Sequence, residues 1–104
     1  MERIKITKET LLNNGFKEIY KEELWKNAYK DFYGVDDFFV AELWTEDESP
    51  IKIDMRYKIT NNGTDWNMHI DNEDCETIGS ADIDYVDQFN KMMEIFESNY
   101  ELKP

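Results

Sequence analysis

Apolar and polar residues alternate most regularly in the middle of the chain. Every second residue is apolar over Ile51–Ile59, and the alternation returns over Trp66–Ile70. A period of two predicts strands with one buried face and one solvated face. Asn62-Gly63, between the two runs, is a favoured pair for a two-residue type I′ turn. The pattern therefore predicts an antiparallel hairpin over Ile51–Asp71.

The turn and the alternation together predict how these strands pair. With Asn62-Gly63 as the loop, apolar residues face apolar residues across the hairpin. A slip by one residue would turn every side chain to the other face. The predicted pairs are Ile59–Trp66, Tyr57–Met68 and Met55–Ile70 on the apolar face, and Lys58–Asn67, Arg56–His69 and Asp54–Asp71 on the polar face.

Apolar residues with helical spacing lie towards both ends of the chain. A first helix is predicted over Thr7–Phe16, with Thr7 as its N-cap and Asn14-Gly15 as its stop. A closing helix is predicted over Tyr85–Asn99, with Asp82 or Asp84 as its N-cap. The apolar stripe of the closing helix comprises Tyr85, Val86, Phe89, Met92, Met93, Phe96 and Tyr100.

The segment after the first helix has two interpretations. Apolar residues at steps of three to four predict a helix from about Glu22 to Tyr33, which Gly34 ends. The alternative is a strand over Phe16–Tyr20 followed by a loop, because aromatic residues also favour strands. The residues of the helical stripe are Leu24, Trp25, Ala28, Tyr29 and Phe32.

A strand is also predicted on each side of the hairpin. Phe38–Trp44 is rich in strand formers, and Glu76–Ala81 forms a weaker strand broken by Gly79. Both faces of Phe38–Trp44 are partly apolar, so either a second layer such as the Trp25 helix covers it, or it is exposed to a partner. The candidate interaction surface comprises Trp25, Phe38, Trp44, Glu46, Asp47 and Glu48.

These elements predict a single α+β domain over residues 1–104. Its two layers would be an antiparallel meander sheet of three or four strands and helices from both ends of the chain, packed on one face. A hydrophobic fraction of 40% and an aromatic fraction of 14% are sufficient for one core and argue against disorder. No apolar run is long enough to cross a bilayer, and the first residues lack the apolar stretch of a secretory signal. The single cysteine, Cys75, suits a reducing compartment, so we expect a cytoplasmic protein.

Charge narrows the classes of partner. Twelve basic and 24 acidic residues give a formal net charge of −12. Such a chain repels nucleic acid and anionic membranes, so neither is expected as a partner. The simplest role of the excess acids is to keep the protein soluble. They are also compatible with binding of a basic protein partner or with mimicry of nucleic acid.

Few residues offer catalytic or metal chemistry. His69 is the only histidine, and Cys75 follows in a predicted turn surrounded by acids, which disfavour a thiolate. Asp54, His69 and Asp71 share one face of the hairpin, but their spacing matches no known metal motif. The chain contains no phosphate-binding glycine loop and no GxSxG or HExxH motif. We therefore expect no enzyme activity, no cofactor and no metal.

Two segments resemble a group of small proteins. Thr7-Lys8-Glu9-x-Leu11-Leu12-x-Asn14-Gly15-Phe16 and Ile83-Asp84-Tyr85-Val86-Asp87-Gln88-Phe89 are similar to signatures in uncharacterised small proteins of gut anaerobic bacteria of the bacteroides type and of their phages and mobile elements. In the second signature, Asp87 and Phe89 replace a histidine and a leucine. The resemblance implies an accessory, virion or anti-defence protein, and it transfers no site residue.

The sequence thus leads to one expectation and two alternatives. We expect a non-enzymatic protein that acts by protein–protein interaction, with self-association left open. The first alternative is an acidic nucleic-acid mimic that blocks a DNA-binding protein. The second is a metal-binding or catalytic protein that uses His69, Asp71 and Cys75.

Overall fold

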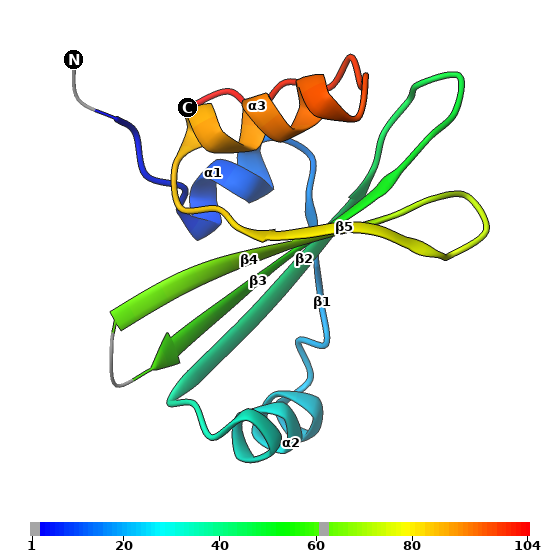
Figure 1. Ribbon diagram of the computed structural model, residues 1–104. Coiled ribbons are helices and arrows are strands. Elements are labelled where there is room, and N and C mark those ends of the chain that lie inside the picture. The colour runs from blue at the N-terminus through cyan, green and yellow to red at the C-terminus, as the bar shows by residue number, and fades with distance from the viewer. Residues whose placement is uncertain (1–2, 61–62) are drawn as a thin grey trace.

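A computed structural model describes residues 3–60 and 63–104 and shows an α+β fold built on one antiparallel sheet (Figure 1). The strands follow one another in chain order across this sheet, as the predicted meander requires. The strands are β1 (Lys17–Ile19), β2 (Asp37–Trp44), β3 (Lys52–Thr60), β4 (Gly63–Asp71) and β5 (Thr77–Asp82), and the helices are α1 (Lys8–Asn13), α2 (Glu23–Tyr33) and α3 (Val86–Ile95). The fold class is confirmed, but the sheet has five strands where three or four were predicted.

The additional strand resolves the two interpretations of the segment after α1, because both are right in part. Residues 17–19 form the short edge strand β1, and residues 23–33 form α2. Gly34 ends α2 with φ at 64°, a left-handed conformation that glycine adopts without a steric penalty. A three-residue strand gives little local signal, and β1 exists because β2 supplies its hydrogen-bonding partners.

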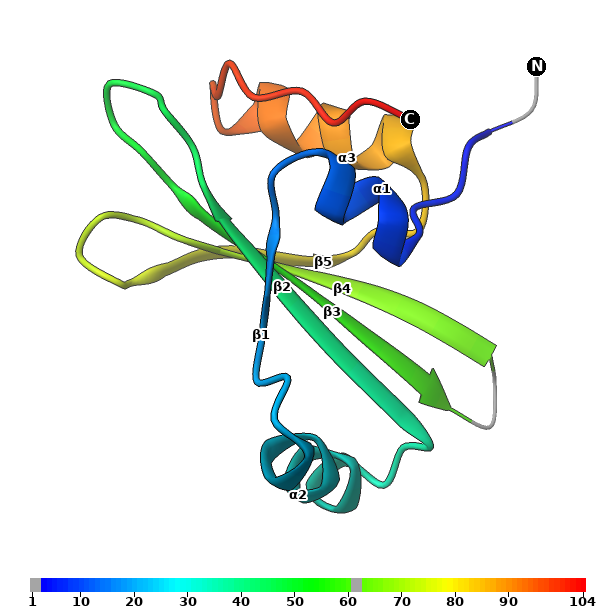
Figure 2. The same ribbon diagram turned by 180° about the vertical axis from the view of Figure 1, so that it is seen from behind.

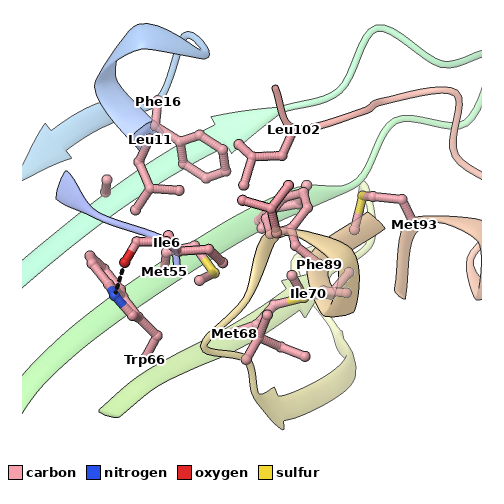
Figure 3. Close-up of a cluster of buried hydrophobic side chains, with 14 of the residues drawn as sticks. Ile6, Leu11, Phe16, Met55, Trp66, Met68, Ile70, Phe89, Met93 and Leu102 are labelled. Atoms are coloured by element: carbon pink, nitrogen blue, oxygen red, sulfur yellow. Dashed lines mark hydrogen bonds between the residues drawn. The ribbon is translucent and has the colours of Figure 1, made fainter. Parts of the chain in front are cut away.

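The core lies between one face of the sheet and the pair α1 and α3 (Figures 1 and 2). Leu11 from α1, Phe89 from α3 and Met68 from β4 are fully buried in it (Figure 3). The Trp66 indole N–H donates to the Ile6 carbonyl at 3.0 Å, which satisfies its polar atom inside the core. Leu102 is also fully buried, so the segment after α3 returns to the core.

The N-terminal helix has the caps that its sequence predicts. The Thr7 hydroxyl accepts from the Thr10 N–H at 3.1 Å, and Gly15 has φ at 91° just beyond the helix. The Phe16 N–H donates to the Leu11 carbonyl at 3.1 Å, which folds the chain back on the helix end.

The closing helix differs from the prediction at both ends. The N-cap is Tyr85 rather than Asp82 or Asp84, and Gln88 Oε1 accepts from the backbone N–H groups of Asp84 and Tyr85, at 3.0 and 3.1 Å. The Asp84 carboxylate instead accepts from the backbone N–H of Trp66, so it ties the helix start to β4. The helix stops at Ile95 rather than Asn99, and Glu97 is left-handed with φ at 57°.

The register of the β3–β4 hairpin differs from the prediction by two residues. The observed pairs include Ile53–Ile70, Met55–Met68 and Tyr57–Trp66 on the apolar face, and Lys52–Asp71, Asp54–His69 and Arg56–Asn67 on the polar face. A shift by two leaves every side chain on its face, so alternation does not distinguish the two registers. The observed register replaces a like-charge pair of Asp54 and Asp71 by an opposite-charge pair of Lys52 and Asp71. Gly63 is a strand residue paired with Thr60, and the rest of the predicted turn lies outside the described residues.

No helix in the described part of the chain is both long and apolar enough to span a bilayer.

Candidate functional site

Helix α2 lies apart from the other two helices, at the opposite end of the molecule in both views (Figures 1 and 2). It packs against β2 through Phe38, while the alternate residue Phe39 points into the core under α1. The helix therefore covers a small part of the sheet face that the core leaves free. None of its eleven residues is buried.

Aromatic rings attach α2 to the sheet. Trp25, Tyr29 and Tyr33 follow one another at helical steps of four, with centroids 6.3 Å apart in both successive pairs. Tyr29 and Tyr33 stack on Phe38 at 5.1 and 5.6 Å, and Tyr20 lies 5.1 Å from Tyr29. This stripe fixes the rotation of the helix on the sheet.

A second apolar stripe of α2 is turned to solvent. Leu24, Ala28 and Phe32 also recur at steps of four, beside the first stripe. Leu24 is 78% exposed and Phe32 is 79% exposed, and Ala28 is exposed as well. Trp25 is half exposed and joins the two stripes. We call Tyr20, Leu24, Trp25, Ala28 and Phe32 the α2 surface.

The α2 surface is electrically neutral in a strongly acidic protein. The eleven residues of α2 contain two lysines and two acidic residues. Lys26 forms an ion pair with Glu18 of β1 at 3.2 Å. Contiguous exposed apolar side chains within a polar surrounding are typical of contact sites for other proteins.

The structure separates the candidate interaction residues into two groups. Trp25 belongs to the α2 surface, and Phe38 lies beneath it, buried, so Phe38 is no exposed contact. Trp44 lies six residues along β2 from Phe38, about 20 Å away along the strand. It borders an open groove of about 840 Å³ together with Asn14, Tyr100 and other residues.

The three acids after Trp44 have different roles. Glu46 and Glu48 are exposed, but Asp47 binds the C-terminal segment. Its carboxylate accepts from the Ser98 hydroxyl at 2.6 Å and from the Asn99 N–H at 2.9 Å. These hydrogen bonds lower the pKa of Asp47 below its usual value. Asp47 is therefore a structural residue rather than a free surface charge.

The polar face of the hairpin brings His69 and Asp71 together but not Cys75. His69 Nε2 lies 3.0 Å from the Thr77 hydroxyl and 3.7 Å from Asp71 Oδ1, and Thr77 donates to the same oxygen at 3.1 Å. Cys75 is free and exposed in the β4–β5 loop, with φ at 62°. Among residues 3–60 and 63–104, no group of three or more His, Cys, Asp or Glu residues is arranged to hold a metal ion.

A buried carboxylate lies at the centre of this polar face. Asp54 is only 6% exposed, and its Oδ1 has no hydrogen-bond partner among the described residues. Lys52 Nζ lies 3.7 Å from Asp54 Oδ2 and 3.5 Å from Asp71 Oδ2. Burial raises the pKa of Asp54, against the opposing charges of Lys52 and Arg56. The arrangement is that of a partly compensated ion cluster.

Leu24 and Phe32 belong to the helical stripe that the sequence predicts, but not to the predicted interaction surface. The signal was the width of that stripe, which contains two neighbouring rows of apolar residues at steps of four. Only the row of Tyr29 and Tyr33 meets the sheet, so the second row is left exposed.

Comparisons of the chain with protein-family models, with curated proteins and with solved structures found no match.

Proposed function

We propose that this protein acts without catalysis, by binding another protein through the α2 surface. The exposed stripe of Leu24, Ala28 and Phe32 carries this proposal. Burying a leucine or phenylalanine side chain that is otherwise exposed yields about 1.5–3 kcal/mol. Two such side chains with a half-exposed tryptophan beside them are a reasonable centre for a modest interface.

The rigidity of the α2 surface supports this proposal. Tyr29, Tyr33 and Phe38 hold the helix in one orientation, so a partner would not have to order it on binding. A surface that is ordered in advance avoids part of the entropic cost of association. The same argument favours a defined partner over non-specific adhesion.

The neutrality of α2 indicates how the partner is recognised. A basic partner would be attracted to the molecule at long range by its charge of −12, but the local contact would be apolar. The rate of association would then fall with salt, while the dissociation rate would change little. The sequence resemblance implies an accessory, virion or anti-defence protein of phage or mobile DNA. A protein of that kind is compatible with such a binding role.

The distribution of acids favours protein binding over the imitation of nucleic acid. A mimic needs carboxylates along one face at phosphate-like spacing. Here exposed acids occur on α1, α2 and α3, in the β2–β3 and β4–β5 loops, and near the C-terminus. Several of them are also paired with lysine or arginine, as in the pair of Arg3 and Asp87 at 3.1 Å.

A capture experiment with matched variants tests the proposal. Leu24→Gln with Phe32→Gln removes the apolar stripe and keeps good helix formers, so the fold should be retained. Leu12→Gln is the control, because Leu12 is an exposed leucine on α1, at the other end of the molecule. We expect wild type and the control to retain the same protein from native cell extract, and the double variant to lose it.

The proposal would be contradicted if all three proteins retained the same set, or if wild type retained nothing above the double variant. Circular dichroism of each variant checks that a loss of capture is not a loss of fold. Substitutions at such exposed positions usually change stability by less than about 0.5 kcal/mol.

A further inference from the structure

An open groove of about 840 Å³ lies between the end of β2 and the C-terminal segment. Trp44 lines this groove and is 46% exposed. Strand β1 pairs with β2 only as far as Glu42, so no described strand lies beside Trp44 on that side. Trp25 and Trp66 pack against tyrosine rings, whereas Trp44 has no ring and no cation over it among the described residues. The indole of Trp44 is therefore accessible to a ligand.

Carboxylates lie on both sides of Trp44 along the chain. Glu42 precedes it by two residues on β2, and side chains two apart on a strand share a face. Glu46 follows it by two residues, is exposed, and lines the same groove as Glu42. Lys17 of β1 is the register partner of Glu42, so Glu46 is the less compensated of the two charges. An accessible indole between two carboxylates favours a cation, because the ring face and the acids all attract positive charge.

The protein holds one of its own arginines with the same pair of groups. The guanidinium carbon of Arg3 lies 4.2 Å from the centroid of the Tyr85 ring. Arg3 Nη2 lies 3.1 Å from Asp87 Oδ2, and Asp87 follows the ring residue by two positions. An aromatic ring and an acid two positions apart thus bind a guanidinium from a distant part of the chain.

A lysine is held in a similar way at the start of β2. Lys8 Nζ lies 5.3 Å from the centroid of the Phe39 ring and 3.3 Å from Oδ2 of Asp37, which precedes that ring residue by two positions. Trp44 combines both arrangements, because one acid lies two residues before it and another lies two residues after it. Tryptophan is also the aromatic residue that attracts cations most strongly. The groove therefore repeats an arrangement that binds cations elsewhere in this protein.

We propose that this groove binds an arginine side chain of a partner protein, with the guanidinium stacked on Trp44 and paired with Glu46. Arginine suits the groove better than lysine does, because a guanidinium is planar and weakly hydrated. It stacks on an indole while its edge donates to a carboxylate. On the opposite wall of the groove, Lys103 is paired with Glu101 at 3.3 Å, so its charge is already compensated.

The arginine has to come from a different protein rather than from a second copy of this chain. The chain contains two arginines, and Tyr85 and Asp87 already hold Arg3. The other one, Arg56, is on the central strand β3, where its charge acts on the buried Asp54. Two copies of charge −12 also repel each other, whereas a basic partner is attracted.

This groove and the α2 surface are separate sites. Helix α2 packs on Phe38 at the start of β2, and Trp44 is the last residue of that strand. Binding of an arginine at the groove therefore does not depend on the function proposed for α2, and the two can be tested apart.

NMR titration of the isotope-labelled full chain tests the proposal with a short glycine-serine peptide that carries one arginine. Matched peptides carry lysine or citrulline instead, and citrulline keeps the shape of arginine without its charge. Trp44→Phe assigns the indole N–H signal of Trp44, and the Trp25 indole serves as the internal control. We expect the arginine peptide to shift the Trp44 signal saturably and to leave the Trp25 signal in place. The lysine peptide should bind more weakly, and the citrulline peptide should not bind.

Glu46→Gln tests whether the acid beside the ring takes part. The dissociation constant of the arginine peptide should rise about twofold to fivefold, because an exposed ion pair contributes about that much. Glu48→Gln is the control, since Glu48 is an exposed neighbouring acid that does not line the groove. Added salt should weaken the binding of the arginine peptide to wild type.

Four outcomes would overturn the proposal. The first is an unshifted Trp44 signal at saturating peptide, and the second is equal shifts of the Trp44 and Trp25 signals, which would indicate non-specific association. The third is a lysine or citrulline peptide that binds as tightly as the arginine peptide does. The fourth is an equal effect of Glu46→Gln and Glu48→Gln on the dissociation constant. Loss of partner capture by the α2 variants, with peptide binding intact, would bear only on the α2 surface.

Discussion

At the scale of single residues, Asp54 and Asp47 show how position decides the effect of a carboxylate. Asp54 is buried on the central strand β3 with one oxygen unpaired, and burial raises its pKa. Asp47 lies in a loop and accepts two hydrogen bonds, which lower its pKa. The same change from carboxylate to amide should therefore have opposite effects at the two positions.

Asp54→Asn should stabilise the protein near neutral pH. Because the pKa of Asp54 is raised in the folded state, folding favours its protonated form. The stability that this proton contributes is fully present below the unfolded pKa of about 3.9, and it is lost as pH rises through the folded pKa. The variant avoids burying the charge, and Lys52 keeps Asp71 as a partner. We expect a gain on the order of 1 kcal/mol at pH 7 that shrinks as pH falls towards about 4. Urea unfolding of both proteins across this range measures it, and a pH-independent difference would contradict it.

At the scale of elements, the C-terminal segment holds several parts of the fold together. Asp47 connects the β2–β3 loop to Ser98 and Asn99, and the Tyr100 hydroxyl donates to the Asn14 carbonyl at 2.8 Å. Burial raises the pKa of Tyr100 to about 12. Leu102 then enters the core between these attachments. The segment lacks regular structure but has the contacts of a structural element.

Asp47→Asn should loosen this segment. Because the pKa of Asp47 is lowered in the folded state, its charged carboxylate stabilises the folded protein at pH values above the unfolded pKa. This stabilisation is lost as pH falls through the folded pKa. We expect a cost below about 1 kcal/mol at pH 7, because solvent screens this accessible carboxylate, and the cost should disappear in acid, because hydrogen bonds to a charged acceptor are stronger than those to an amide. Thermal unfolding measures it, with Glu48→Gln as the exposed neighbouring control. Equal melting temperatures for the two variants at pH 7 would refute the role of Asp47.

The elements also show what a sequence can and cannot predict. α1 and α2 carry their own stop signals in Gly15 and Gly34, so both could be located from local pattern. The hairpin was located, but its register was wrong because a shift by two residues preserves the alternation. The local pattern indicated β1 only as one of two alternatives, because its pairing depends on the distant strand β2. The return of Leu102 to the core also depends on distant contacts, and no local pattern indicates it.

At the scale of the whole molecule, the ends of the structure have different characters. Helix α2 is neutral and aromatic, whereas the β2–β3 and β4–β5 loops carry exposed acids such as Glu46, Glu48, Glu73 and Asp74. This division could not be predicted, because the sequence shows the width of the apolar stripe on α2 and not which half of it meets the sheet. The fold places Tyr29 against β2 and leaves Phe32 in solvent. The α2 surface is thus a consequence of how the helix is rotated on the sheet.

Site-specific photo-crosslinking from Ala28 is the most direct test of the α2 surface as a protein-binding site. Ala28 lies at the centre of the exposed stripe, so a benzoyl-phenylalanine placed there would contact any protein bound to α2. The same group at Leu12, exposed on α1, reports on contacts elsewhere. We predict a crosslinked protein of defined mass from position 28 in native cells and none from position 12. No crosslink from position 28, or the same crosslinks from both positions, would contradict the account.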